Sequence, residues 1–160
     1  MMDAMDKVAG LSPEDSVFKA RRFRPEFVQG GEQCRLSVLQ PAQDQGLAVD
    51  LRLALARRMA ALNADQVLMD DYDAQLLALD PSEQLLALAQ GETKLDEPLA
   101  AIARHVDLVT LTPRAAQASD IERLVQAGLN NPQIVALSEL IAFVNFQTRV
   151  ATGLRLMRSL

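Results

Sequence analysis

Apolar side chains recur every three or four residues along most of the chain, the spacing typical of helices that bury one face. Phe27, Cys34 and Val38 share one face of a helix that we expect to start at Glu26. Residues 47–62 carry two apolar stripes instead of one. A helix with two such stripes is expected to lie between neighbours on both sides.

Prolines, glycines and capping residues indicate where the helices begin and end. Asn63 with Gln66, and Ser119 with Glu122, have the spacing of capping boxes that open two of these helices. Gly91 and Gly128 each follow a helical stretch and are expected to close it. The predicted helices cover about residues 12–22, 26–40, 47–62, 63–79, 82–90, 98–110, 119–128 and 131–157.

The last predicted helix differs from the others because its sequence QIVALSELIAFVNF is apolar around most of its circumference. Such a helix has to be covered on several sides. A bundle of 160 residues can cover about two of those sides, so a second chain is expected to cover the rest. The sequence therefore predicts a homo-oligomer.

Composition supports a single all-α domain over residues 1–160. The chain has 26 Leu and 24 Ala against 12 Val, 4 Ile and 5 Thr. Straight-chain helix formers thus outnumber β-branched residues, as expected for an all-helical protein. The length is near the commonest size of a single domain, and we see no linker or internal repeat.

Charge and rare residues exclude several classes of function. With 16 Lys and Arg against 21 Asp and Glu, the net charge is −5, which disfavours nucleic acid and anionic membranes as partners. One Cys and one His exclude an intramolecular disulfide and a multi-histidine metal site, and no metal or cofactor is expected. The acidic residues 70–73 and the basic residues 19–24 are interpreted as solvated surface, although the basic ones could also hold an anion or a neighbouring subunit.

The first residues of the chain and its apolar runs indicate a cytoplasmic protein. The first ten residues, MMDAMDKVAG, are acidic and lack the apolar stretch of a secretory signal. The longest apolar runs, Leu85–Ala89 and Leu140–Val144, are far shorter than the about 20 residues that span a bilayer. No membrane association is expected.

The stretch from Ala127 to Leu154, AGLNNPQIVALSELIAFVNFQTRVATGL, carries the string aromatic-x-Asn-aromatic-x-x-Arg. Its members are Phe143, Asn145, Phe146 and Arg149. This segment resembles the closing segment of the alkylhydroperoxidase D-like proteins in the carboxymuconolactone decarboxylase superfamily. The similarity extends over about residues 45–155.

The resemblance implies an all-α bundle of six to eight helices that assembles as a homo-oligomer. It divides the single domain into an N-terminal helical extension, residues 1–44, and the family-like helical core, residues 45–157. Active members carry a glutamate, a Cys-x-x-Cys pair and a histidine as their redox centre. The positions matched to these four groups are Leu53, Asp65, Leu68 and Tyr72, so the resemblance implies a divergent member without the dithiol chemistry.

Three functions remain open at this point. The leading interpretation is a small-molecule-binding or structural oligomeric protein that has lost the redox dithiol. One alternative is a cofactor-free, decarboxylase-type enzyme in which Asp65 and Tyr72 perform acid-base chemistry. The other is a peroxidase-related antioxidant enzyme that uses Cys34 alone.

Each candidate residue also has a structural interpretation. Asp65 fits the first turn of a helix, where the dipole favours a carboxylate. Tyr72 is expected to be half-buried with a satisfied hydroxyl, and Leu53 and Leu68 to belong to the core. In the structural interpretation these four residues have no catalytic role.

The remaining candidates have the same two interpretations. Cys34 is expected to be an inert core residue because it shares an apolar face with Phe27. His105 is expected at the surface or at an interface. Asn145 and Arg149 lie four residues apart in an apolar helix, so they are expected to form a polar network between helices or subunits, or else to line a pocket.

Overall fold

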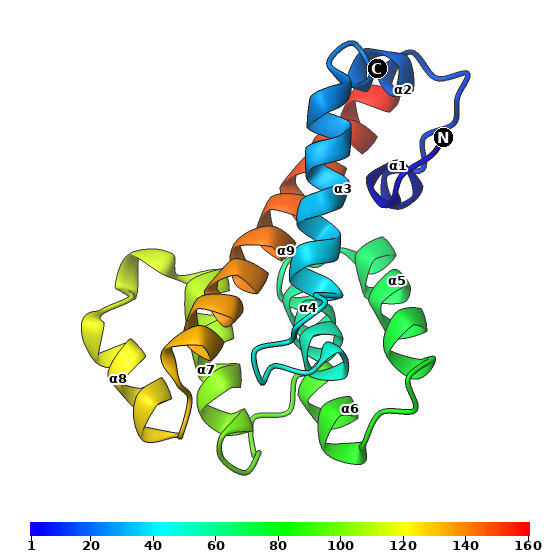
Figure 1. Ribbon diagram of the computed structural model, residues 1–160. Helices are drawn as coiled ribbons and strands as arrows, with labels where there is room; N and C mark the ends of the chain where they lie inside the picture. The colour runs from blue at the N-terminus through cyan, green and yellow to red at the C-terminus, as the bar shows by residue number, and fades with distance from the viewer.

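Nine α-helices and one short 3-10 helix, with no strand, make up the regular structure of the computed structural model, which describes all 160 residues (Figure 1). The all-α fold class is thereby confirmed. The helix count exceeds the six to eight expected, since residues 4–9 form a helix where none was predicted. The elements are α1 Ala4–Ala9, α2 Ser16–Arg21, α3 Pro25–Leu39, α4 Val49–Leu62, α5 Gln66–Leu77, α6 Glu83–Ala89, α7 Leu99–Leu111, η1 Pro113–Ala115, α8 Ala118–Gln126 and α9 Asn131–Arg158.

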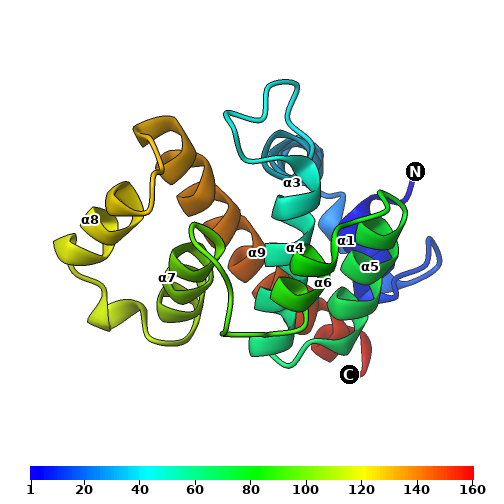
Figure 2. The same ribbon diagram turned by 90° about the horizontal axis from the view of Figure 1, so that it is seen from below.

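Helix α4 lies at the centre of the molecule. It contacts α5, α6, α7 and α9, and Figure 2 shows it surrounded by them. Leu53, Leu55 and Met59 are fully buried there. The two apolar stripes of this segment therefore do face neighbours on different sides, as predicted.

Three helix starts differ from the predicted ones, and the first is α2, which begins at Ser16 and not at about residue 12. The residue that caps α5 is Asp65, whose side chain accepts a hydrogen bond from the N–H of Leu68, and Asn63 instead ends α4. Ala64 between them has a left-handed backbone (φ 55°), which separates the two helices. Helix α8 begins at Ala118 with a capping box between Gln117 and Asp120, not between Ser119 and Glu122.

Helices α1 and α2, most of α3 and the C-terminal part of α9 form an arm that projects from the body formed by the remaining helices (Figure 1). A core cluster of 29 buried residues fills the body and also includes Val8 of α1. The arm has a second, separate cluster of five: Ala9, Leu11, Val17, Phe18 and Leu154. Most of α3 is exposed, since only Val38 and Leu39 at its end are buried.

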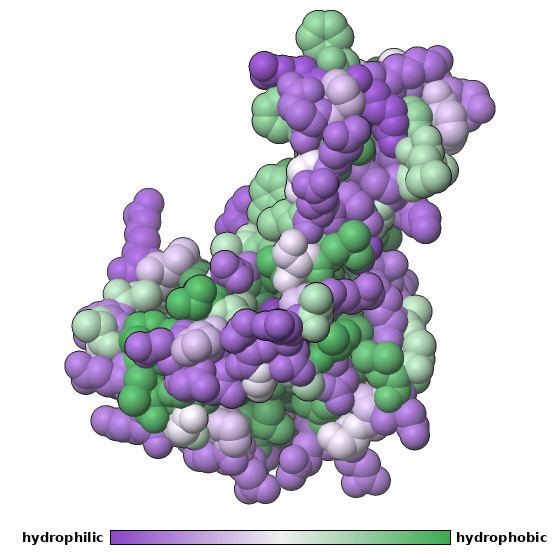
Figure 3. Space-filling model, in the orientation of Figure 1, coloured by the Kyte–Doolittle hydropathy of each residue, from purple (hydrophilic) through white to green (hydrophobic).

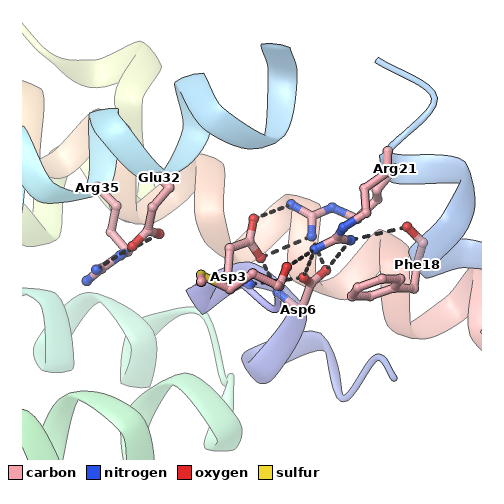
Figure 4. A network of polar contacts seen from close by, with 8 residues as sticks. Asp3, Asp6, Phe18, Arg21, Glu32 and Arg35 are labelled. Carbon is pink, nitrogen blue, oxygen red and sulfur yellow. Dashed lines mark hydrogen bonds and ion pairs between the residues drawn. The ribbon is translucent and has the colours of Figure 1, made fainter. Parts of the chain in front are cut away.

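Ion pairs connect α1 to α2 in this arm (Figure 4). The carboxylate of Asp6 is fully buried and bonds both Arg21 and Arg22, and Asp3 bonds Arg21 at 3.0 Å. The guanidinium of Arg22 also lies 3.4 Å from the ring centre of Phe18. The interpretation of the basic run as solvated surface is therefore wrong for its two central arginines.

The buried guanidinium of Arg52 fixes the chain where α3 joins the body. It donates to the carbonyl oxygens of Leu47, Val38 and Asp44, each at 2.7 Å. No carboxylate is bonded to it, and burial lowers its pKa. The side chain of Arg52 thus connects the end of α3, the loop that follows it and the start of α4.

Helix α9 connects body and arm over its 28 residues. It is long and apolar enough, by length and composition alone, to cross a membrane, yet 56% of its most apolar stretch is buried inside the protein. Burial of this kind is typical of a core helix.

Candidate functional site

The four positions matched to the family's redox centre are packed inside the protein and line none of its five main hollows. Leu53 and Leu68 are fully buried in the core, as predicted, and so is Tyr72. These positions pack α4 against α5 and α9.

The carboxylate of Asp65 forms hydrogen bonds and an ion pair within the protein. It accepts the N–H of Leu68 at 3.1 Å and two bonds from Arg155, at 2.7 and 3.1 Å. The same guanidinium donates to the carbonyl of Val8 at 2.8 Å. Asp65 is thus a buried cap and ion-pair partner, and Arg155, which ties α9 to α5 and α1, was not identified from the sequence.

Tyr72 is more buried than expected. Its hydroxyl donates a hydrogen bond to Oε1 of Gln147 on α9. Burial raises the pKa of the phenol, and nearby Asp71 raises it further. The hydroxyl therefore stays protonated at neutral pH and is committed to a partner inside the protein.

The structure contradicts the interpretation of Cys34 as a core residue. The thiol is exposed, and Phe27 on the same face is 65% exposed. The physical reason is that α3 stands out on the arm, so this face borders an open groove instead of a packed neighbour. This α3/α9 groove, of about 650 Å³, is also lined by Phe143, Phe146 and Glu139.

A second hollow, of about 590 Å³, lies between α7, η1, α8 and α9, and we call it the α7/α9 cleft. The helices that form it can be followed in Figure 2. No carboxylate lines it, and Arg149 is its one permanently charged group. Its polar lining is His105, Gln117, Ser138, Asn145 and Arg149, and its apolar lining includes Ile121 and Ile141.

His105 is the most unusual residue of this cleft. It is only 8% exposed, which contradicts the expected surface position, and it makes no hydrogen bond. Nδ1 is fully enclosed without a partner, so Nε2 is the ring nitrogen that can meet the cleft. Burial lowers the pKa of the imidazole, and Asp120 only partly opposes this, so the ring is neutral at pH 7.

Asn145 joins the cleft to the core. Its side chain accepts from Asn63 at 3.0 Å and donates to the carbonyl of Ile141 at 2.9 Å and to the hydroxyl of Thr110 at 3.4 Å. It therefore links α4, α7 and α9 in a polar network, and it also lines the cleft. Both roles that the sequence suggested for Asn145, a network between helices and a pocket lining, are thus combined in one side chain. Arg149 bonds only the carbonyl of Asn145 within the protein.

The acidic residues of α5 do not gather into a cation site. Nowhere in the chain do three or more His, Cys, Asp or Glu side chains lie close enough to hold a metal ion. Asp71 is half-buried, and burial raises the pKa of its carboxyl.

Comparison with known proteins bears on the fold alone. No protein-family model and no curated protein matches the sequence. Among solved structures, the chain resembles an uncharacterized peroxidase-related protein from Silicibacter sp. TM1040, with a TM-score of 0.72 and 18% sequence identity. The match covers 92% of this chain and 77% of the other. The helical architecture is thus shared with a peroxidase-related protein, in agreement with the fold that the resemblance implies.

The pKa of His105 can be measured without assignment because the chain has one histidine. We expect the ring protons in an NMR titration to give a pKa below 6.5. A ring that titrated at or above 6.5 would contradict the buried, unpaired position.

Proposed function

We propose that this protein binds a small organic anion in the α7/α9 cleft and has no thiol-based redox activity. The observation that carries the proposal is the buried, unpartnered imidazole of His105 beside a cleft that contains one cation and no carboxylate. Nδ1 is enclosed, so a ligand in the cleft would meet the imidazole at Nε2, which makes no hydrogen bond within the protein. The fold itself does not imply this function.

The size and lining of the cleft support a small ligand of mixed character. Its volume of about 590 Å³ is within the about 300 to 1,000 Å³ of small-molecule sites. Ile121 and Ile141 offer an apolar wall, while Gln117 and Asn145 offer hydrogen bonds. The exposed guanidinium of Arg149 matches a carboxylate, which it can bind through two parallel hydrogen bonds.

The absence of redox chemistry is supported by the residues at the matched positions. Asp65 is bonded to Arg155, Tyr72 to Gln147, and both leucines are fully buried. Neither an alkyl side chain nor a carboxylate can pass through the thiol oxidation states that reduce a peroxide. The same contacts argue against acid-base catalysis by Asp65 and Tyr72.

Hexanoate binding tests the proposal, with hexan-1-ol as the uncharged probe of equal length. We expect hexanoate to shift the NMR signals of His105 and to raise its pKa, since a carboxylate nearby favours the imidazolium. Hexan-1-ol should bind more weakly. Arg149→Gln should weaken hexanoate binding about tenfold, equivalent to about 1.4 kcal/mol.

Arg114→Gln is the matched control because it removes the same charge from an exposed position of η1 that lies outside the cleft lining. Equal loss in both variants would indicate general electrostatic attraction and contradict a site at Arg149. Unchanged His105 signals with hexanoate would also contradict the proposal.

The exposure of Cys34 favours a second candidate, a peroxidase-related activity of this thiol. We expect iodoacetamide to label Cys34 without denaturant, because Cys34 is exposed at the α3/α9 groove. Hydroperoxide turnover that disappears in Cys34→Ser would establish the second candidate and contradict the first.

A further inference from the structure

Helix α9 carries a stripe of residues that the chain leaves largely exposed. Its residues are spaced three and four apart, so they lie on one face. Val135 is 57% exposed and Phe146 is 50% exposed. The stripe runs between the α7/α9 cleft and the α3/α9 groove, and Ala142 lines both. We call Val135, Glu139, Ala142, Phe146, Arg149 and Gly153 the α9 stripe.

The α9 stripe is complementary to itself when reversed. Glu139 and Arg149 lie equally far from Val144 on opposite sides. Ala142 and Phe146 are likewise symmetric about Val144, and so are Val135 and Gly153. An antiparallel copy of the helix would therefore place acid against base and a small side chain against a large one.

We propose that a second copy of this chain docks on the α9 stripe, with the two α9 helices antiparallel and a two-fold axis near Val144. Phe146 of each copy then packs on Ala142 of the other and toward its α3/α9 groove. Arg149 of each copy pairs with Glu139 of the other. Such a contact is isologous, so it closes as a dimer.

Exposed apolar surface on the arm and the body favours this occupant. Phe146, together with Phe27 across the groove, presents large aromatic surface to water. Figure 3 has the orientation of Figure 1 and shows exposed hydrophobic side chains beside α3, in the region where α9 passes behind it. Aromatic anchors in a pocket with charged pairs around them are typical of protein interfaces.

The dimer does not depend on the proposed ligand. A guanidinium has five N–H donors, so Arg149 can bond Glu139 of the second copy along one edge and face the α7/α9 cleft with another. Glu139 and Phe146 lie outside the cleft lining, so loss of the dimer in Glu139→Arg or Phe146→Asp with hexanoate binding unchanged separates the two proposals. The ligand probe reports on His105, whereas the dimer is detected by mass.

Charge reversal tests the pairing. We expect the unmodified protein to sediment as a dimer and Glu139→Arg or Arg149→Glu alone to shift it toward monomer, because like charges then face each other. The double variant Glu139→Arg/Arg149→Glu restores opposite charges and should restore the dimer. Both residues are exposed, so circular dichroism should show unchanged folding.

Phe146→Asp tests the aromatic anchor in the same assay. A carboxylate in the centre of the apolar contact should give a folded monomer. Val135→Asp is not equivalent, since Val135 lies near one end of the stripe and should weaken the dimer less.

Cross-linking tests the direction of the helices. In a Cys34→Ser background, a mixture of Val135→Cys and Gly153→Cys chains should form a disulfide between the two kinds of chain. Gly153 has nothing within 4 Å of an added Cβ, so it accepts the cysteine. In the antiparallel dimer two cysteines at position 135 would lie about 27 Å apart, from 1.5 Å per helical residue, so Val135→Cys alone should not cross-link.

Three results would overturn the proposal. A monomer at every concentration would show that no second copy docks on the α9 stripe. A dimer that the charge reversals and Phe146→Asp leave intact would place the interface elsewhere. Cross-linking of Val135→Cys with itself would show parallel helices.

Discussion

Asp65→Asn is expected to lower the free energy of unfolding by about 2 to 4 kcal/mol, because it removes one partner of a buried ion pair and leaves the other. Asn remains a good N-cap, so the variant isolates the charge from the cap. The side chain of Asp65 is 3% exposed and that of Arg155 30% exposed, which puts the effect below that of a fully enclosed pair. Urea denaturation measures it.

A double-mutant cycle with Arg155→Gln separates this ion pair from other effects. Since the two groups bond each other, the losses in Asp65→Asn and Arg155→Gln should not add. Asp65→Ala also removes the cap of α5 and should cost about 1 kcal/mol more. If Asp65 served as a catalytic acid instead, Asp65→Asn would leave stability unchanged while abolishing activity, and that outcome would contradict its structural role.

Asp6→Asn is expected to destabilise the arm by about 3 kcal/mol, because two arginines lose the buried carboxylate they share. Hydrogen exchange of α1 and α2 should rise most, since Asp6, Arg21 and Arg22 join these helices. The charge change alone is controlled by Asp96→Asn, which alters an exposed carboxylate in the loop before α7. Equal protection of α1 and α2 in Asp6→Asn and the unmodified protein would contradict the expectation.

The same carboxylate gives the arm a pH dependence. Burial alone would raise the pKa of Asp6, but hydrogen bonds from Arg22 and the N–H of Asp3 and the charge of Arg21 outweigh it and lower the pKa. The unfolded chain therefore binds the proton more readily than the folded one. The stabilisation is present above the ordinary carboxyl pKa of about 4 and is lost as the pH falls below it. Asp6→Asn should lack this part of the acid dependence.

The sequence was informative about helices and less so about their ends. Hydrophobic spacing located the segments because it depends on residues close in the chain. Asn63 and Asp65 are both good caps, and the left-handed Ala64 between them decides the choice. That backbone conformation leaves no trace in the spacing of apolar residues.

The candidate site was harder to predict because burial depends on distant contacts. Cys34 lies on an apolar face that has no packed neighbour, whereas His105 lies among polar residues yet is enclosed by α8 and α9. The sequence did identify Asn145 and Arg149 as polar groups in an apolar helix. It could not bring them together with His105 and Gln117, which reach the same cleft from other helices.

The three carbonyls that Arg52 holds lie at the junction from which the arm leaves the body. A lysine there could not span all three from one rigid plane, because its donors sit on a single nitrogen. Arg52 therefore helps to fix the end of α3, where Val38 lines the α3/α9 groove. Replacing Arg52 is expected to change the shape of that groove without altering any residue that lines it.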